Sequence, residues 1–376
     1  MDKFDIDIDI GGACNLRCPS CPQGNVKEYR LPHGFMAPEL LERIVAKARS
    51  ECRELNISLY NWAEPLLHPR LPELIRIVQD AGIPCRLSSN LNILPNLDAI
   101  MAANPANWRI SNSGFSQEVY GRTHRGGHIE KVKKHMQELA AAKKRHQAAT
   151  RIYVYYHRYR HNLREEPLMR DFATSLGFYF HGVWALFFPL EKILSCVGQE
   201  VGDFLLTEED RMLIDSLALP LPTALAAARQ YESRPCRLRE DEISLDFQGN
   251  FTLCCGVYDA RKYTLGNYLD LPLDEIQRLR QRHPLCRLCM RQGAHAYITY
   301  GIDEMDELAL ANVDPADAKF LDLDYDMAWE RWAHRLGKLY DRFLAGLLPA
   351  GQKEALAARF LRVQRSFRSI RRKGRS

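Results

Sequence analysis

The 376-residue sequence has no apolar run long enough to span a bilayer. Its first residues, Met1–Asp5, also lack the basic, apolar and small-residue segments of a secretion signal. Because 46% of the residues are hydrophobic, a globally disordered chain is excluded, and the length is sufficient for two domains. Eleven cysteines without an export signal indicate metal ligation in a reducing compartment, so we expect a cytoplasmic protein without disulfides.

Three of the cysteines, Cys14, Cys18 and Cys21, lie close together near the start of the chain. Three thiolates at this spacing can hold three irons of a cuboidal [4Fe–4S] cluster, which leaves the fourth iron open. Clusters that only carry electrons normally have a cysteine on every iron, so the triplet indicates chemistry at the cluster. A zinc knuckle is the alternative, but zinc needs a fourth ligand and more often shows two paired motifs.

Residues 4–189 alternate between strand-like and helix-like segments. The predicted strands are residues 5–10, 55–60, 84–88, 108–111, 151–157 and 178–187, and the predicted helices are 38–48, 72–80, 96–103, 129–146 and 163–175. This order is typical of a parallel sheet with right-handed crossovers. The sequence therefore predicts an α/β fold, an open partial (β/α)6 TIM barrel, with its chemistry at the C-terminal strand ends where the cysteines fall.

The cysteine triplet resembles the signature of the radical S-adenosylmethionine (radical SAM) superfamily, whose open iron binds the methionine part of SAM. In that superfamily, reductive cleavage of SAM releases a 5′-deoxyadenosyl radical that removes hydrogen from an unactivated carbon. The resemblance implies a SAM-binding [4Fe–4S] cluster on Cys14, Cys18 and Cys21 and an electron donor such as flavodoxin or ferredoxin. One position departs from the family pattern, because Ser20 replaces an aromatic residue that packs near the adenine.

Glu64 and Pro65 follow the second predicted strand and resemble the end of the family's Gly-Gly-Glu-Pro segment, which holds the SAM ammonium group. Trp62 and Ala63 stand in place of the two glycines.

Three further stretches resemble SAM-binding segments and follow the third and fourth predicted strands. The resemblance places the ribose contact at Ser89 and Asn90, and another family contact at Ser111. Arg125 is the candidate partner of the SAM carboxylate, since a guanidinium binds a carboxylate through two hydrogen bonds.

A second group of cysteines follows the predicted barrel: Cys236, Cys254, Cys255, Cys286 and Cys289. Residues 243–253 alternate on both sides of Gln-Gly-Asn, which predicts a β-hairpin with Gly249 at positive φ. The group resembles the twitch domain, a shortened relative of the SPASM domain of radical SAM enzymes. The resemblance implies one auxiliary [4Fe–4S] cluster, with the ligands Cys236, Cys254, Cys286 and Cys289.

Two alternatives for this second group stay open. Four cysteines at such spacing also suit a structural zinc site. Cys254 and Cys255 compete for one ligand position, because neighbours on a strand face opposite sides; the spacing from Gly249 favours Cys254.

The barrel interior is predicted to be polar. In the first strand the isoleucines face the helices, so Asp7 and Asp9 point inward, and Tyr155 and His157 share one face of the fifth strand. Asp9, Tyr155 and His157 are candidates for proton transfer, and such a lumen suits a polar substrate. The alternative is that Asp5 and Asp7 only pair with lysines at the bottom of the barrel.

The C-terminal part is predicted to be helical, with amphipathic segments at residues 316–345 and 352–376. No acid follows Glu354, so the last segment is strongly basic and suits an anionic surface or partner, unless its apolar stripe packs internally. We expect a barrel at 1–190, a helical bridge at 191–235, a twitch-like domain at 236–295 and a helical extension at 296–376.

The leading interpretation is a radical SAM enzyme with net oxidation of a small polar or sugar substrate through the auxiliary cluster. A maturase that crosslinks or epimerises a peptide is the alternative. Such relatives often carry a leader-binding domain ahead of the barrel, whereas the first strand here begins almost at the N-terminus, which favours a small substrate. A non-catalytic zinc and nucleic-acid-binding protein is a remote third interpretation.

Overall fold

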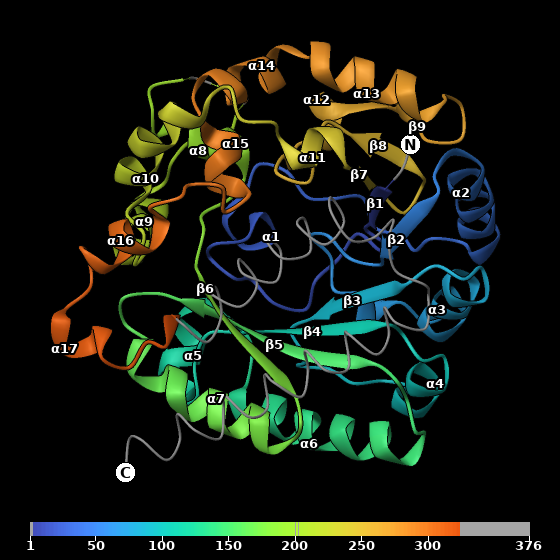
Figure 1. The fold of residues 1–376 in the computed structure, drawn as a ribbon, viewed down its shortest axis with the longest axis horizontal. Coiled ribbons are helices and arrows are strands. Elements are labelled where there is room, and N and C mark those ends of the chain that lie inside the picture. Colours follow the sequence, from blue (N-terminus) through green and yellow to red (C-terminus); the bar gives the residue numbers. More distant parts are fainter. Residues whose placement is uncertain (1–2, 200, 202, 324–376) are drawn as a thin grey trace, which may run out of the picture. The chain divides into compact units, whose positions relative to one another are not determined.

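Six parallel strands form the centre of the fold in the predicted order (Figure 1). They are β1 (Lys3–Ile8), β2 (Glu54–Ser58), β3 (Cys85–Ser89), β4 (Asn107–Asn112), β5 (Arg151–Arg158) and β6 (Tyr179–Trp184). Each strand pairs in parallel with the next, which confirms the predicted α/β partial barrel. The computed structural model describes residues 3–199, 201 and 203–323.

Helices cover the outer side of this sheet (Figure 1): α2 (Pro38–Glu51), α3 (Leu71–Asp80), α4 (Leu97–Ala102), α6 (Ile129–Arg145) and α7 (Glu166–Ser175). As predicted, the isoleucines of β1 are fully buried in one apolar cluster with Leu41 and Ile44 of α2. Burial of each such side chain contributes about 1.5–3 kcal/mol. This outward packing leaves the opposite face of the strands to polar side chains.

A further strand extends the sheet beyond β1. β7 (Glu242–Leu245) pairs in parallel with β1, so that Ser244 lies opposite Asp7. β8 (Asn250–Thr252) and β9 (Thr264–Asn267) continue the sheet in antiparallel pairing. Gly249 has a φ of +79° in the turn, as the predicted hairpin requires. The segment before Cys254 is therefore part of the barrel's own sheet.

The remaining helices connect these strands and cover the second cysteine group. They are α1 (Pro22–Asn25), α5 (Gln117–Thr123), α8 (Leu190–Ser195), α9 (Glu208–Ser216), α10 (Leu221–Ala228), α11 (Arg237–Glu240), α12 (Ala260–Tyr263), α13 (Leu273–Arg282), α14 (Pro284–Arg291), α15 (Ala294–Ile298), α16 (Met305–Leu310) and α17 (Pro315–Ala318), with short 3₁₀ turns at Pro65–Leu67, Leu163–Glu165 and Arg229–Tyr231. None of the helices that the structure describes is both long and apolar enough to cross a membrane.

The described residues up to Leu321 form one compact unit. The expected boundaries near residues 190, 235 and 295 all fall inside this unit and stay predictions. The predicted helix at 352–376 and most of the one at 316–345 lie outside the described residues.

One buried ion pair ties the end of β5 to the start of α7. The guanidinium of Arg158 donates from Nε and Nη2 to the two carboxylate oxygens of Glu166, each at 2.7 Å, and both side chains are 1% exposed. Gly182 of β6 makes room for this arrangement, because a Cβ there would lie 2.4 Å from Cζ of Arg158. The pair therefore joins β5, β6 and α7.

We expect Glu166→Ala to lower the free energy of unfolding by about 3–5 kcal/mol, because it leaves a buried guanidinium without its carboxylate. Glu118→Ala is the matched control, since it breaks the exposed Arg122–Glu118 pair, and should cost at most about 1 kcal/mol. Denaturant unfolding followed by circular dichroism measures both. Equal effects of the two substitutions would contradict the assignment of a structural role to Glu166.

Candidate functional site

The loop that carries the first three cysteines follows β1 and turns tightly. The carbonyl of Cys18 accepts from the backbone N–H of Cys21 at 3.1 Å, and Cys21 caps α1 by accepting from Gly24 and Asn25. A Cβ on Gly24 would lie 2.2 Å from the Cys18 carbonyl oxygen, so only glycine fits there. The backbone thus holds Cys18 and Cys21 in a fixed relation.

The three thiols of this loop are buried close to one another, so their ionised forms need a cationic partner. Burial raises the pKa of Cys14 to about 11, and burial together with the charge of Cys14 raises that of Cys21 to about 12. Burial and the other two cysteines raise the pKa of Cys18 as well. Three thiolates in this position need compensating positive charge, which an iron–sulfur cluster supplies.

Within the described part of the chain, no three Cys, His, Asp or Glu side chains form a site for a single metal ion. A cuboidal cluster makes a different demand, since each of its thiolates binds a separate iron. The donor set of Cys14, Cys18 and Cys21 therefore fits three irons of such a cluster.

The carboxylate of Asp9, at the end of β1, holds the loop after β2 through hydrogen bonds to its backbone. Its Oδ1 accepts from the backbone N–H of Asn61 at 3.1 Å and of Ala63 at 2.8 Å, and its Oδ2 accepts from Trp62 at 3.1 Å. Burial raises the pKa of Asp9 to about 6, while these hydrogen bonds act to lower it. The sequence analysis missed this anchoring contact; the proton-transfer role of Asp9 stays a prediction.

Glu64 lies at the end of the anchored loop, next to the cysteines. Its N–H donates to the carbonyl of Ala13 at 2.9 Å, while its carboxylate accepts from Leu66 at 3.1 Å and from Asn90 at 2.9 Å. Burial raises the pKa of Glu64 to about 7. Pro65 begins the 3₁₀ turn that follows.

Asn90 connects the end of β3 to the cysteine loop. Its Nδ2 donates to Oδ1 of Asn15 at 2.9 Å and lies 3.8 Å from Sγ of Cys14. Ser89 accepts from the N–H of Leu91 at 2.9 Å. The structure therefore brings Cys14, Glu64, Ser89 and Asn90 together from the ends of three strands.

The other two predicted SAM contacts are placed differently. Ser111 lies on β4 opposite Tyr155 of β5. Arg125 pairs with Glu209 of α9 and is about half exposed (48%), while its carbonyl accepts from the N–H of Arg17 at 3.0 Å. The backbone of Arg125 thus touches the cysteine loop, and the pairing of its side chain with SAM stays a prediction.

A tyrosine that the sequence analysis missed lies beside Ser20. Tyr159 directly follows β5, is 2% exposed, and donates from its hydroxyl to Oγ of Ser20 at 3.0 Å. An aromatic side chain therefore reaches the position before the third cysteine from another strand. Its place immediately after a predicted strand was the only available signal.

Three cysteines of the second group, Cys236, Cys254 and Cys286, lie near Arg280 of α13, and Cys289 lies near the same three cysteines. Besides burial, the charges of Cys236 and Cys286 raise the pKa of Cys254, which reaches about 12, and the charge of Cys254 raises that of Cys289. The guanidinium of Arg280 is 1% exposed and donates to the carbonyls of Leu238, Glu242 and Leu253 and to Oε1 of Gln277.

No carboxylate in the described part of the chain forms an ion pair with Arg280; the charges of Cys254, Glu242, Cys236 and Cys286 counter the lowering of its pKa by burial. A buried cation is costly without a negative partner. Four thiolates around a cluster provide such a partner, so this donor set fits an anionic cluster.

Cys255 faces away from that group. Burial, followed by the charges of Glu242, Cys254 and Asp7, raises its pKa, so this thiol lies toward the acids on the inner face of β1 and β7. This placement favours Cys254 as the fourth ligand.

The inner face of the barrel is polar, as expected. Burial and the charge of Glu242 raise the pKa of Asp7 to about 8, and burial and the charge of Arg109 lower that of His157 to about 4. The rings of Tyr155 and His181 lie 5.2 Å apart. Asp5 pairs with Arg86 at 3.0 Å, an arginine in place of the lysine that the alternative interpretation expects.

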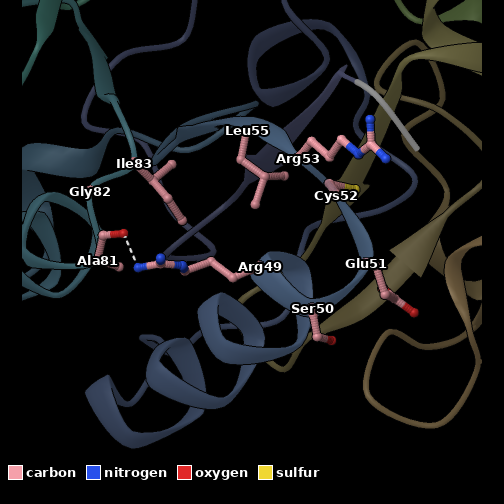
Figure 2. Close-up of a pocket in the computed structure, with 9 residues that line it drawn as sticks. All are labelled: Arg49, Ser50, Glu51, Cys52, Arg53, Leu55, Ala81, Gly82 and Ile83. Atoms are coloured by element: carbon pink, nitrogen blue, oxygen red, sulfur yellow. Dashed lines mark hydrogen bonds between the residues drawn. The ribbon is translucent and has the colours of Figure 1, made fainter.

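A cavity of about 560 Å³ lies at the other end of the barrel, before β2 and β3 (Figure 2). Figure 2 shows the end of α2 facing the turn Ala81–Ile83, where Arg49 donates to the carbonyl of Ala81. Because barrel chemistry lies at the C-terminal strand ends, this cavity is not the candidate site.

The family comparison settles the nature of the barrel. The model of the radical SAM superfamily matches residues 8–165, which include the cysteine loop, Glu64, Asn90 and Arg125. Residues 8–165 belong to the radical SAM superfamily. This match confirms the expected family for the barrel. Members of the superfamily are enzymes that use a [4Fe–4S] cluster and SAM.

A GTP 3′,8-cyclase of Chlorobaculum tepidum is 27% identical over 148 residues, which cover 37% of this chain and 43% of that protein. The chain thus spans less than half the length of this curated relative.

Among solved structures, Streptococcus suis SuiB bound to the precursor peptide SuiA has a TM-score of 0.51 at 13% identity, covering 77% of this chain and 67% of that chain. SuiB bound to S-adenosylmethionine also has a TM-score of 0.51 at 13% identity, covering 76% of this chain and 67% of that chain. These two likenesses show the radical SAM fold.

We expect Cys254→Ala to lose about four irons per chain, since the auxiliary cluster loses a ligand, whereas Cys255→Ala keeps its iron. Anaerobic reconstitution followed by iron and sulfide analysis measures both variants. The reverse result, with loss only in Cys255→Ala, would overturn the choice of Cys254.

Proposed function

We propose that the protein is a radical SAM enzyme that abstracts hydrogen from a small polar or sugar substrate, with net oxidation. The observation that carries this proposal is the convergence of Cys14, Glu64 and Asn90 at the C-terminal strand ends of the radical SAM domain. A cluster bound by the first three cysteines would supply the electron that cleaves SAM to the 5′-deoxyadenosyl radical.

Glu64 is suited to hold the ammonium group of SAM. Each of its carboxylate oxygens accepts one backbone hydrogen bond, and a carboxylate offers about four acceptor positions. Burial raises its pKa to about 7, so a bound ammonium would favour the ionised form. The contact between Glu64 and Ala13 keeps this carboxylate beside the cysteine loop.

Tyr159 is suited to the adenine. The family pattern places an aromatic side chain before the third cysteine, and this chain has Ser20 there. The hydroxyl of Tyr159 binds Ser20, so its ring offers an aromatic surface at that place.

The second cysteine group supports net oxidation. After hydrogen abstraction, the substrate radical must lose one electron and one proton to become an oxidised product. A cluster on Cys236, Cys254, Cys286 and Cys289 would accept the electron, since all four irons are then held by the protein. His157 on the inner face of β5 would take the proton, since its imidazole is neutral near pH 7; the pKa of about 4, lowered by burial and by the charge of Arg109, makes it a weak base.

A peptide substrate is the second candidate. The observation in its favour is the fold likeness to SuiB, which was solved with its precursor peptide. Either substrate requires an external reductant, and we propose a flavodoxin or ferredoxin as the electron donor.

The first test measures iron and SAM cleavage. Anaerobically reconstituted protein should hold about eight irons, and the change of Cys14, Cys18 and Cys21 to Ala should remove about half of them together with all formation of 5′-deoxyadenosine. Stoichiometric zinc without iron uptake would refute the proposed function.

The second test separates hydrogen abstraction from oxidation. We expect the double variant Cys286→Ala and Cys289→Ala to form 5′-deoxyadenosine with dithionite but little oxidised product, because the electron has no acceptor. Candidate metabolites and peptides are labelled with deuterium, and transfer of the label to 5′-deoxyadenosine identifies the substrate. Circular dichroism checks folding, and normal product yield from a folded variant would exclude the electron-acceptor role.

A further inference from the structure

Arg109 is a cation in the interior of the barrel. It lies in the middle of β4, on the same face as Tyr153 and Tyr155, which line the inner side of β5. Its Nε donates to Oγ of Ser88 on β3 at 2.9 Å. No described residue accepts a hydrogen bond from its two terminal nitrogens, which leaves these donors for another group on the inner face.

The rings around Arg109 fix its orientation. Its Cζ lies 4.9 Å from the ring centroid of Tyr60 and 5.2 Å from that of Tyr155. Tyr60 immediately precedes the loop that Asp9 anchors and that ends at Glu64. The guanidinium therefore lies on the inner face of the sheet, against the residue from which the loop to Glu64 begins.

Arg109 has no ion-pair partner among the described residues, unlike Arg86 on the same inner face of the sheet, which pairs with Asp5 at 3.0 Å. The direct contacts of Arg109 are the Ser88 hydroxyl and the two tyrosine faces, and Asp7, His157 and Tyr300 lie near enough to interact with its charge. Cation–π contacts offset part of the cost of burying a charge, but they leave the terminal donors without an acceptor.

Asp7, an acid near Arg109, does not neutralise the guanidinium. Asp7 contributes a favourable interaction with Arg109, yet its pKa is raised to about 8, so this carboxyl is largely neutral at pH 7. Arg109 itself stays charged, because a guanidinium is not deprotonated in proteins. The lumen thus presents a fixed positive charge with free donors.

We propose that Arg109 binds an oxyanion of the substrate, a carboxylate or a phosphate group, through its terminal nitrogens. A planar guanidinium binds either group with two parallel hydrogen bonds. The contacts with Ser88 and the two tyrosine rings orient the guanidinium plane before the substrate binds. This inference rests on the proposed function in that it names the substrate class of the same site.

The test uses anaerobically reconstituted protein and the probes inorganic phosphate and succinate, titrated calorimetrically at constant ionic strength. We expect saturable binding of at least one probe, and Arg109→Gln should weaken it by about tenfold to a hundredfold. Arg122→Gln is the matched control, because Arg122 is an exposed arginine on α5 and should leave the affinity unchanged. A stronger response to phosphate or to succinate distinguishes the two oxyanions.

Two further arms keep the result interpretable. Ser88→Ala removes only the hydroxyl that holds Nε, so it should weaken binding severalfold even if Arg109→Gln does not fold. The titration is repeated with saturating SAM, and the expected result is unchanged probe affinity.

Loss of probe binding in the presence of SAM would assign Arg109 to the carboxylate of SAM and overturn the proposal. So would equal affinity in wild-type protein and a folded Arg109→Gln, or no binding by wild-type protein. Formation of 5′-deoxyadenosine by the same samples tests the proposed function separately, since neither phosphate nor succinate is needed for it.

Discussion

The carboxylate of Asp9 is the contact on which the site's geometry depends. Three consecutive backbone N–H groups, those of Asn61, Trp62 and Ala63, end on its two oxygens. A hydrogen bond to a charged acceptor is worth about 1.5–3 kcal/mol, so together these contacts strongly favour one loop conformation. Because the loop continues directly into Glu64, the position of that carboxylate beside Cys14 follows from an aspartate at the end of β1.

Two arginines differ in how their charge is balanced, the buried Arg280 and the partly buried Arg109. Arg280 and Arg109 both lack a carboxylate partner in the described residues, and both are held in place by neutral oxygens. For Arg280 the cysteines provide the negative charge, whereas the direct contacts of Arg109 are the Ser88 hydroxyl and two aromatic faces. Arg280 therefore serves as a structural counter-charge to the cysteines, whereas Arg109 keeps donors for a ligand.

The sequence predicts the barrel well because its strands and helices have clear periods. The alternation of aspartate and isoleucine in residues 5–10 correctly places Ile6 and Ile8 against the helices. The pairing of β7 with β1 escaped prediction, because two short strands more than two hundred residues apart carry no local signal of their register.

The candidate site was predictable only where a motif names its residues, as for Cys14 and Glu64. The roles of Asp9, Tyr159 and Arg109 depend on which backbone or side chain lies opposite them, and that is a property of the fold. Arg109 in particular occurs in a strand, Trp108–Ser111, whose alternation alone does not tell a lumen cation from an exposed one.

The pairing of β1 with β7 has a consequence for electron movement. One strand leads into the first cysteine loop and the other into the hairpin that ends at Cys254. The backbone N–H groups of Asp5 and Asp9 donate to the carbonyls of Asp241 and Leu245 and hold the two strands in register. The loop of Cys14 and the hairpin that leads to Cys254 are thus carried by adjacent strands of one sheet. For clusters held at these two positions, the sheet would fix the distance over which an electron tunnels between them.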